Sequence, residues 1–177
     1  WPGIKWSERK MQWTAPSGAK LWLSYLDKDQ DVTRYQGLAF SWIGFDELTQ
    51  WATPFAWSYM RSRLRSADPT LPLSMRATTN PGGRGHGWVK KMFIDPAPAG
   101  KSYIATDIET GEQLKYPAGH EKAGRPLFKR RFIPARLKDN PYLAQQGDYE
   151  AMLLSLPEQQ RRQLLDGDWD IKEGAAF

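Results

Sequence analysis

The chain has no cysteine and only two histidines among its 177 residues. Without cysteine, disulfide scaffolds, zinc ribbons and thiol catalysis are excluded for this sequence. Two histidines are too few for a histidine-rich metal site. No run approaches the roughly 18 to 20 consecutive apolar residues that a membrane-spanning helix needs.

Apolar and aromatic side chains, by contrast, are plentiful. The sequence is 40% hydrophobic and 13% aromatic, with nine tryptophans. Disordered chains are poor in aromatic residues, so this composition favours a packed core. At roughly 150 residues per domain, the length fits about one domain. Because the chain begins at Trp1 rather than at methionine, we expect a trimmed chain or an internal piece of a longer protein.

Basic residues are concentrated in the middle of the chain. Residues 1–60 carry six basic and six acidic groups, residues 61–138 carry a net charge of +10, and residues 139–177 a net charge of −5. A basic section of this kind suits a polyanion such as nucleic acid, whose binding releases counterions. A solvated basic face on an ordinary domain explains the charge as well.

The hydrophobic pattern divides the chain into two sections near residue 97. Residues 1–96 predict an α/β section, and residues 97–177 a smaller α+β section. In the first section we expect a hairpin from Met11–Ala15 and Lys20–Leu26, strands of the fully buried type at Leu38–Phe45 and Leu73–Thr79, and helices over 53–65 and 88–94. In the second we expect short strands at Ser102–Ile108, Gln113–Tyr116 and Leu127–Pro134, one helix that opens at Asp139 or Asn140 and runs through Leu153, and another from the capping pair Ser155 and Glu158 to Gly167.

Two carboxylates directly follow the first apolar strand. The run Ile43–Phe45 ends in Asp46 and Glu47, the pattern of a Walker B site. The carboxyl end of such a strand faces the crevice of an open α/β sheet, where ligands bind. There Asp46 can hold a Mg²⁺ ion that bridges nucleotide phosphates, and Glu47 can polarise the attacking water. Alone, the pattern also fits a helix start, with Asp46 as N-cap and Glu47 in the first turn.

A second set of polar residues follows the next apolar strand. Leu73–Thr79 comes about 30 residues later and ends in Thr78, Thr79 and Asn80. Two strands joined through a helix lie parallel, which would bring both polar ends to the same edge of the sheet. Hydroxyl and amide groups there can bond a γ-phosphate or the attacking water. An ordinary turn before Pro81 is the alternative.

No phosphate-binding loop is present in these residues. Gly100, Lys101 and Ser102 match the end of the motif G-x-x-x-x-G-K-S/T, but Asp95 stands where its first glycine belongs. Pro96 and Pro98 also remove backbone N–H donors that such a loop needs. The residues that follow predict a strand rather than a helix, so no helix N-terminus would face the anion.

Seven short motifs in order resemble the large terminase subunit of tailed bacteriophages and prophages. They are Tyr35–Gly37, Ile43–Leu48 (IGFDEL), Arg63–Arg65, Thr78–Gly83 (TTNPGG), Gly85–Lys90 (GHGWVK), Asp139–Leu143 (DNPYL) and Gly167–Ile171 (GDWDI). The resemblance extends over nearly the whole chain, from about Trp13 to Phe177. It implies the back half of an ATPase domain over 1–96 and a linker subdomain over 97–177.

The resemblance implies a fold and a chemistry for these sections. The fold would be α/β, a partial RecA-like P-loop ATPase core of the additional-strand class with a small α+β linker subdomain. Asp46 would coordinate Mg²⁺ with ATP as substrate, Glu47 would be the catalytic carboxylate that activates water, and Thr78, Thr79 and Asn80 would couple hydrolysis to DNA movement. In the family, the phosphate loop lies upstream of the Walker B strand and the nuclease domain lies downstream, so both fall outside this chain. We therefore expect the isolated chain to be inactive.

The resemblance also implies partners and a location. The parent protein would package double-stranded DNA into a procapsid, act with the portal and the small terminase subunit, and assemble as a ring of identical subunits. It would work in the host bacterial cytoplasm, transiently at the portal vertex. For contact with DNA phosphates the candidates are Arg84, Lys90, Lys91, Lys129 and Arg131, each of which also fits a solvated basic face.

Three acidic residues near the end of the chain are not candidates for the nuclease. Asp166, Asp168 and Asp170 are better explained as a solvated turn around a buried Trp169.

Two other functions stay open for the whole chain. One is a piece of another additional-strand nucleoside triphosphatase, such as a helicase or recombinase. The other is a non-enzymatic nucleic-acid or assembly module from a degenerate prophage.

Overall fold

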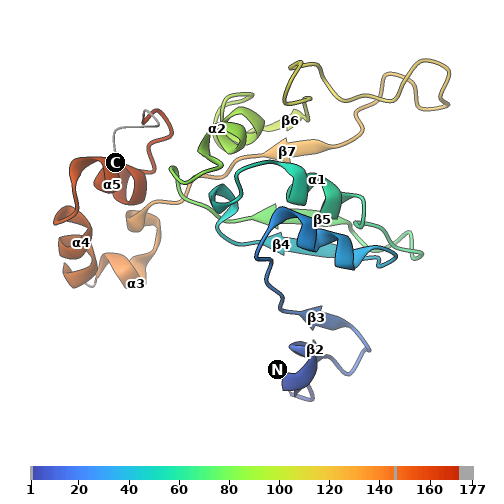
Figure 1. The fold of residues 1–177 in the computed structure, drawn as a ribbon, viewed down its shortest axis with the longest axis horizontal. Helices are drawn as coiled ribbons and strands as arrows, with labels where there is room; N and C mark the ends of the chain where they lie inside the picture. The colour runs from blue at the N-terminus through green and yellow to red at the C-terminus, as the bar shows by residue number, and fades with distance from the viewer. Residues whose placement is uncertain (1, 146, 172–177) are drawn as a thin grey trace.

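The computed structural model describes residues 2–145 and 147–171, and the end of the predicted linker section, residues 172–177, lies outside them. The chain is a mixed α/β structure with small sheets (Figure 1). Its strands are β1 (Lys5–Ser7), β2 (Gln12–Thr14), β3 (Lys20–Trp22), β4 (Trp42–Phe45), β5 (Ser74–Ala77), β6 (Ser102–Ile104) and β7 (Lys129–Arg131). Its α-helices are α1 (Phe55–Arg61), α2 (His86–Val89), α3 (Pro141–Ala144), α4 (Gly147–Leu154) and α5 (Glu158–Arg161). Shorter helical turns include η2 (Asp29–Tyr35), η3 (Leu48–Gln50), η4 (Lys90–Ile94), η5 (Leu137–Asp139) and η6 (Arg162–Asp166).

The N-terminal sheet is an antiparallel meander in the order β1-β2-β3. The predicted hairpin is confirmed, with Gln12 opposite Trp22 in β2 and β3. Trp6 of β1 lies opposite Trp13 of β2, and their ring centroids are 4.2 Å apart. Aromatic cross-strand pairs of this kind stabilise short antiparallel ladders, which explains why three-residue strands hold their register here.

The two central strands pair in parallel, as their connection through a helix predicts. Trp42 of β4 is in register with Ser74 of β5, and Phe45 with Ala77. Helix α1 forms the crossover between them and buries Ala56, Trp57 and Met60. As a result, both strands end at the same edge of this sheet (Figure 1).

The prediction that these strands are buried on both faces is wrong. Ile43 is buried, but Trp42, whose side chain projects from the opposite face, is 49% exposed. Arg76 of β5 is also exposed. Within the described residues this sheet has two strands, and helix packing covers one of its faces. The other face is left open. The indole of Trp42 lies across Gly44 on the open face, where a Cβ atom would overlap the ring.

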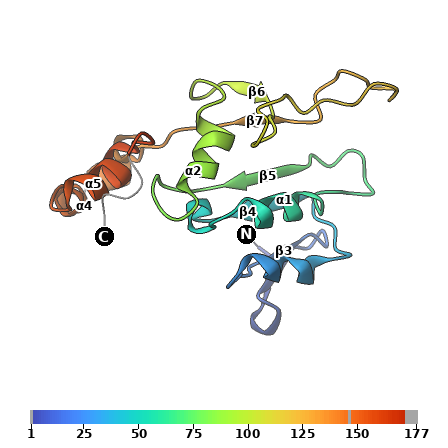
Figure 2. The ribbon, with the colours of Figure 1, turned by 45° about the horizontal axis from the view of Figure 1, so that its top comes forward.

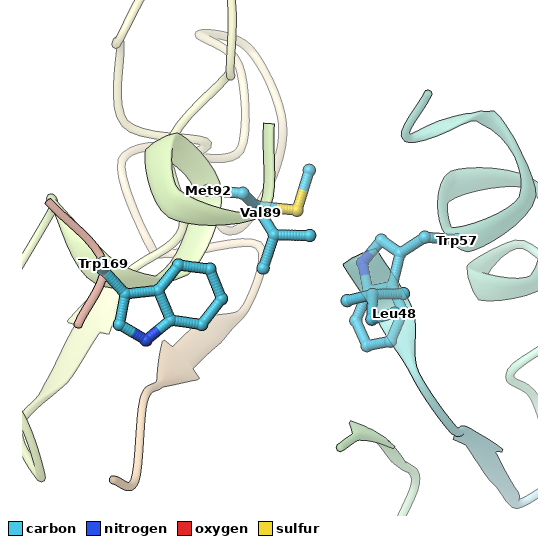
Figure 3. Packing of buried hydrophobic residues seen from close by; sticks show 5 residues of the cluster. All are labelled: Leu48, Trp57, Val89, Met92 and Trp169. Carbon is cyan, nitrogen blue, oxygen red and sulfur yellow. The ribbon is translucent and has the colours of Figure 1, made fainter. Parts of the chain in front are cut away.

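Two hydrophobic clusters cover the packed face of this sheet. One contains Val32, Ile43, Ala56 and Met60. The other contains Leu48, Trp57, Val89, Met92 and Trp169 (Figure 3). Partly buried Phe45, Trp51 and Met75 pack against both clusters and join them. The second cluster joins residues from both predicted sections of the chain.

The helices differ from the prediction at their ends. Helix α1 stops at Arg61 rather than at residue 65, because Phe40 donates a backbone hydrogen bond to Arg63 and accepts one from Arg65. The helix predicted over 88–94 begins two residues earlier, at His86, and widens into a π-helical turn over Lys90–Ile94.

The C-terminal half is less regular than predicted. The predicted strand at Gln113–Tyr116 forms only isolated bridges from Gln113 and Lys115. Asn140 caps α3 as predicted, with its Oδ1 accepting from the backbone of Tyr142 and Leu143. The helix expected to continue through Leu153 is described as two, α3 and α4.

The capping box predicted at the start of the last helix does not form. The hydroxyl of Ser155 donates to the carbonyl of Met152 at 2.7 Å, so it belongs to the end of α4 and not to the start of α5. Gly167, at φ +63°, ends the last helical turn as predicted.

The chain returns to the central sheet after α5. Trp169 is buried and stacks on His86, with ring centroids 5.3 Å apart and planes at 24°. Asp170 forms an ion pair with Lys90 at 3.0 Å. Figures 1 and 2 show the C-terminal helices to one side of β4 and β5. Trp169 and Asp170 connect these helices to α2 and the turn η4 through the contacts with His86 and Lys90. The expected burial of Trp169 is confirmed. Within the described residues, no helix has the length and apolar character to cross a membrane.

We predict that Gly85→Ala lowers the free energy of unfolding by about 1–3 kcal/mol, the usual cost of overpacking. A Cβ at this position would overlap the carbonyl oxygen of Trp51 and would lie 2.5 Å from Nε1 of Trp88. Gly147→Ala is the matched control, because nothing lies within 4 Å of its Cβ position and its φ is not positive. Urea unfolding of both variants measures the difference, and equal stabilities would contradict this packing.

Candidate functional site

Asp46 and Thr78 meet at the edge where β4 and β5 end. Asp46 follows the last residue of β4, and Thr78 follows the last residue of β5. The backbone N–H of Thr78 donates to Phe45 and its carbonyl accepts from Leu48, so the start of this loop is fixed. The hydroxyl of Thr78 donates to Oδ1 of Asp46. The structure thus brings together the two sequence-predicted groups that stand 32 positions apart.

Glu47 has a left-handed backbone, with φ 51° and ψ 51°. Left-handed residues other than glycine, asparagine and aspartate are uncommon, and such strain is found most often at functional sites. The alternative of a helix start does not match this geometry. Asp46 caps no helix, and its Oδ1 accepts from the N–H of Glu47 at 3.1 Å. The side chain of Glu47 is exposed.

The residues present fit a Mg²⁺ ion that is held mainly by phosphates. Both hydrogen bonds to Asp46 use Oδ1, and its Oδ2 has no hydrogen-bond partner among the described residues. Nowhere in the described part of the chain do three or more His, Cys, Asp or Glu side chains gather as a complete metal site. Mg²⁺ in nucleotide sites is commonly bound by one or two carboxylates plus phosphate oxygens and water, which one carboxylate at a strand end satisfies.

Thr79 faces inward rather than toward Asp46. Its hydroxyl oxygen lies 3.0 Å from the backbone nitrogen and 2.8 Å from Oγ1 of Thr49, a residue that is 2% exposed. Asn80 is exposed, and its carbonyl accepts from the same Thr49 hydroxyl at 3.0 Å. Sequence reasoning missed Thr49, because it lies in a turn between Leu48 and Gln50 and its partner Thr79 is 30 positions away.

The turn after Asn80 is held by a buried histidine. Nδ1 of His86, which is 3% exposed, accepts from the N–H of Gly82 at 2.8 Å. Gly82 has φ +94°, and a Cβ there would lie 2.6 Å from Nε2 of Gln163. His86 and Gln163 therefore place the C-terminal section directly against this turn, a contact that no short-range pattern predicts.

The basic residues predicted to contact DNA are scattered. Lys90 is paired with Asp95 at 3.3 Å and with Asp170 at 3.0 Å, and these contacts raise the pKa of Lys90. Arg131 donates to the hydroxyl of Ser102 at 3.0 Å. Three others, Arg84, Lys91 and Lys129, are exposed.

Three arginines lie at the end of α1 and just after it, namely Arg61, Arg63 and Arg65. They do not form a cluster at the site. Arg65 donates to the carbonyls of Gly37 and Leu38, and Arg63 lies over the ring of Tyr59. Arg61 lies over the ring of Phe128, and burial together with the charge of Arg130 lowers the pKa of Arg61 to about 10. Arg61 and Arg65 thus make contacts within the fold.

A groove of about 660 Å³ extends along β4 to the site. Its lining includes Trp22, Tyr25, Phe40, Trp42 and Asp46. The polar side chains of Lys20, Ser24 and Ser41 also line it.

We predict that the left-handed backbone at position 47 tolerates unbranched side chains better than β-branched ones. Glu47→Val should lower the free energy of unfolding by about 1–2 kcal/mol, the cost of a left-handed L-residue. Glu47→Asn should stay near the wild type, because asparagine tolerates this conformation. Chemical unfolding of the two variants measures the order, and a Val variant as stable as the Asn variant would refute the strain.

Comparisons with protein-family models, curated proteins and solved structures give no match to this chain, so any function rests on the residues described above.

Proposed function

We propose that this chain is part of an ATP-driven motor that packages double-stranded DNA, the large terminase subunit of a tailed phage or prophage. In this proposal, residues 1–96 are the back half of a RecA-like ATPase core of the additional-strand class. Residues 97–177 are the linker subdomain that leads toward a nuclease. Support comes from the order of the seven motifs and from the arrangement of their polar residues at one sheet edge.

The observation that carries the proposal is the contact of Asp46 with Thr78. In doubly wound α/β sheets, ligands bind outside the carboxyl ends of parallel strands. Asp46 and Thr78 lie at that edge, on neighbouring parallel strands, and are joined by a hydrogen bond. The strained Glu47 lies between Asp46 and the turn η3. An acid, a hydroxyl and a second acid at one strand edge are among the groups that nucleotide hydrolysis uses, together with a phosphate loop.

Each of these residues has a distinct part in the proposed reaction. A Mg²⁺ ion, when bound, would neutralise phosphate charge. Asp46 offers Oδ2 as a ligand while Thr78 and the N–H of Glu47 hold Oδ1. Glu47 accepts a proton from the attacking water. Thr78 would keep or lose its bond to Asp46 as the charge at the site changes, and the loop that begins at Thr78 leads to Gly82, which His86 holds.

Reading the coding DNA on both sides of this segment is the first test. The proposal expects the motif G-x-x-x-x-G-K-S/T after a strand within about 150 residues upstream, and spaced acidic residues of a nuclease downstream. An open reading frame with neither feature would contradict the proposal and favour a binding module. If a phosphate loop is present, a procapsid requirement for full ATPase activity distinguishes a packaging motor from a helicase, which unwinds a tailed duplex.

We predict that Glu47→Gln abolishes ATP turnover in the protein that carries both this segment and a phosphate loop, while ATP binding persists. The amide keeps the size of the side chain but cannot accept the proton of the water. Turnover by a phosphate-release assay and binding of a fluorescent ATP analogue measure the two effects. Glu112→Gln removes an exposed carboxylate elsewhere and is the control. An active Glu47→Gln protein would refute the role of Glu47.

We also predict that the 177-residue chain alone does not hydrolyse ATP, because it contains no phosphate loop to hold the β- and γ-phosphates. The purified chain should release phosphate no faster than its Asp46→Asn variant does. ATP hydrolysis that is present in the wild-type chain and lost in Asp46→Asn would contradict the proposal that the complete site needs residues from an upstream segment.

A further inference from the structure

We propose that Thr49 is the positioning residue that fixes the loop after β5. Of the two threonines in that loop, Thr79 is held by Thr49, and Thr78 is the one whose hydroxyl binds the carboxylate of Asp46. The inference rests on the proposed function for its consequence in the motor. Its structural part rests on contacts of the described residues alone.

Thr49 joins the loops that follow the two parallel strands. Its N–H donates to Oγ1 of Thr79 at 3.0 Å, and the hydroxyl oxygens of Thr49 and Thr79 are 2.8 Å apart. The Thr49 hydroxyl also lies 3.0 Å from the carbonyl of Asn80, and the Thr49 carbonyl accepts from the N–H of Gly85 at 2.7 Å. One buried residue thus contacts the loop at both of its ends.

A hydroxyl has one proton to donate. The hydroxyl of Thr79 has two acceptors within reach, the hydroxyl of Thr49 at 2.8 Å and the carbonyl of Asn80 at 3.3 Å. If Thr49 donates to the carbonyl of Asn80, Thr79 donates to Thr49, and if Thr49 donates to Thr79, Thr79 donates to the carbonyl of Asn80. In both arrangements the proton of Thr79 is used within this group, and its oxygen accepts from the backbone N–H of Thr49. This leaves its hydroxyl no proton for a γ-phosphate, whereas the hydroxyl of Thr78 points at Asp46.

The surroundings of Thr49 leave little room for movement. A Cβ on Gly83 would lie 2.8 Å from the carbonyl oxygen of Thr49, so the backbone of the loop passes directly over it. Buried hydroxyls that lose a partner cost more than exposed ones, because water cannot replace the bond. Thr49 therefore sets where the loop lies, and Thr79 acts as its anchor rather than as a sensor.

The test compares Thr49→Val with Thr49→Ser. Valine has the shape of threonine without the hydroxyl, and serine keeps the hydroxyl. Amide hydrogen exchange is measured by NMR in the 177-residue chain. The probe is the N–H of Leu48, which donates to the carbonyl of Thr78. The reference is the N–H of Ala105, which donates to the carbonyl of Phe128. We expect exchange at Leu48 to become about tenfold faster in Thr49→Val, with Thr49→Ser and the Ala105 amide near wild type.

A double-mutant cycle with Thr79→Val tests the pair itself. Because the two hydroxyls share one hydrogen bond and each has a further partner, the double variant should lose clearly less stability than the sum of the two single losses. Additive losses, wild-type exchange at Leu48 in Thr49→Val, or equal damage from Thr49→Ser would each overturn the proposal. If Thr49→Val does not fold, exchange in Thr79→Val decides the same question, because it removes the other hydroxyl of the pair.

The consequence for the motor is measured separately. In the protein with its phosphate loop, Thr49→Val should keep ATP turnover but move less DNA per ATP, and Thr49→Ser should restore the ratio. An unchanged ratio in an active motor would overturn this part of the proposal. A wild-type protein that hydrolyses no ATP would instead contradict the proposed function, and the exchange experiment would still decide whether Thr49 anchors the loop.

Discussion

The parallel register of β4 and β5 is the constraint on which the site depends. A shift of one strand by one residue would turn its packed side chain, Ile43 or Met75, to the open face and would separate Asp46 from Thr78. The register is set by burial, because Ile43 and Met75 are paired and both face the packed side. The same burial therefore fixes the core and the chemistry. This coupling explains how a sheet that has two strands within the described residues can present a defined arrangement of polar groups at its edge.

The C-terminal segment adds a second constraint to the same loop. Trp169 belongs to the cluster of Leu48 and Val89, and it also stacks on the histidine that holds Gly82. The loop after β5 is thus held by Thr49 and His86 of the first section, and Trp169 of the other section packs on His86. A change at Asp46 has a set of packed and hydrogen-bonded contacts through which it can reach Trp169. Such contiguity supplies a physical route, and the equilibrium between two arrangements of the loop remains the quantity to measure.

Short-range patterns predicted the central part of the molecule well. The parallel pairing followed from two apolar runs joined by a helix, and the closeness of Asp46 and Thr78 followed from that pairing. Burial was predicted less well, because a hydrophobic run shows the presence of a strand but not how many neighbours cover it. Trp42 is the example, since nothing in its sequence context shows that one face of β4 lies open. Thr49 and His86 could not be found from local sequence either, because Thr79 lies 30 positions from Thr49 and the ring that stacks on His86, Trp169, lies 83 positions from it.

The two-stranded sheet has a further consequence, for the handling of the isolated chain. Strands β4 and β5 are parallel partners, and within the described residues neither has a strand on its other side. An unpaired strand edge displays backbone donors and acceptors that can template pairing with another molecule. Here the edge lies beside the half-exposed indole of Trp42, so backbone pairing and aromatic contact favour the same encounter. Self-association that grows with concentration follows from this backbone geometry, whatever chemistry the edge performs.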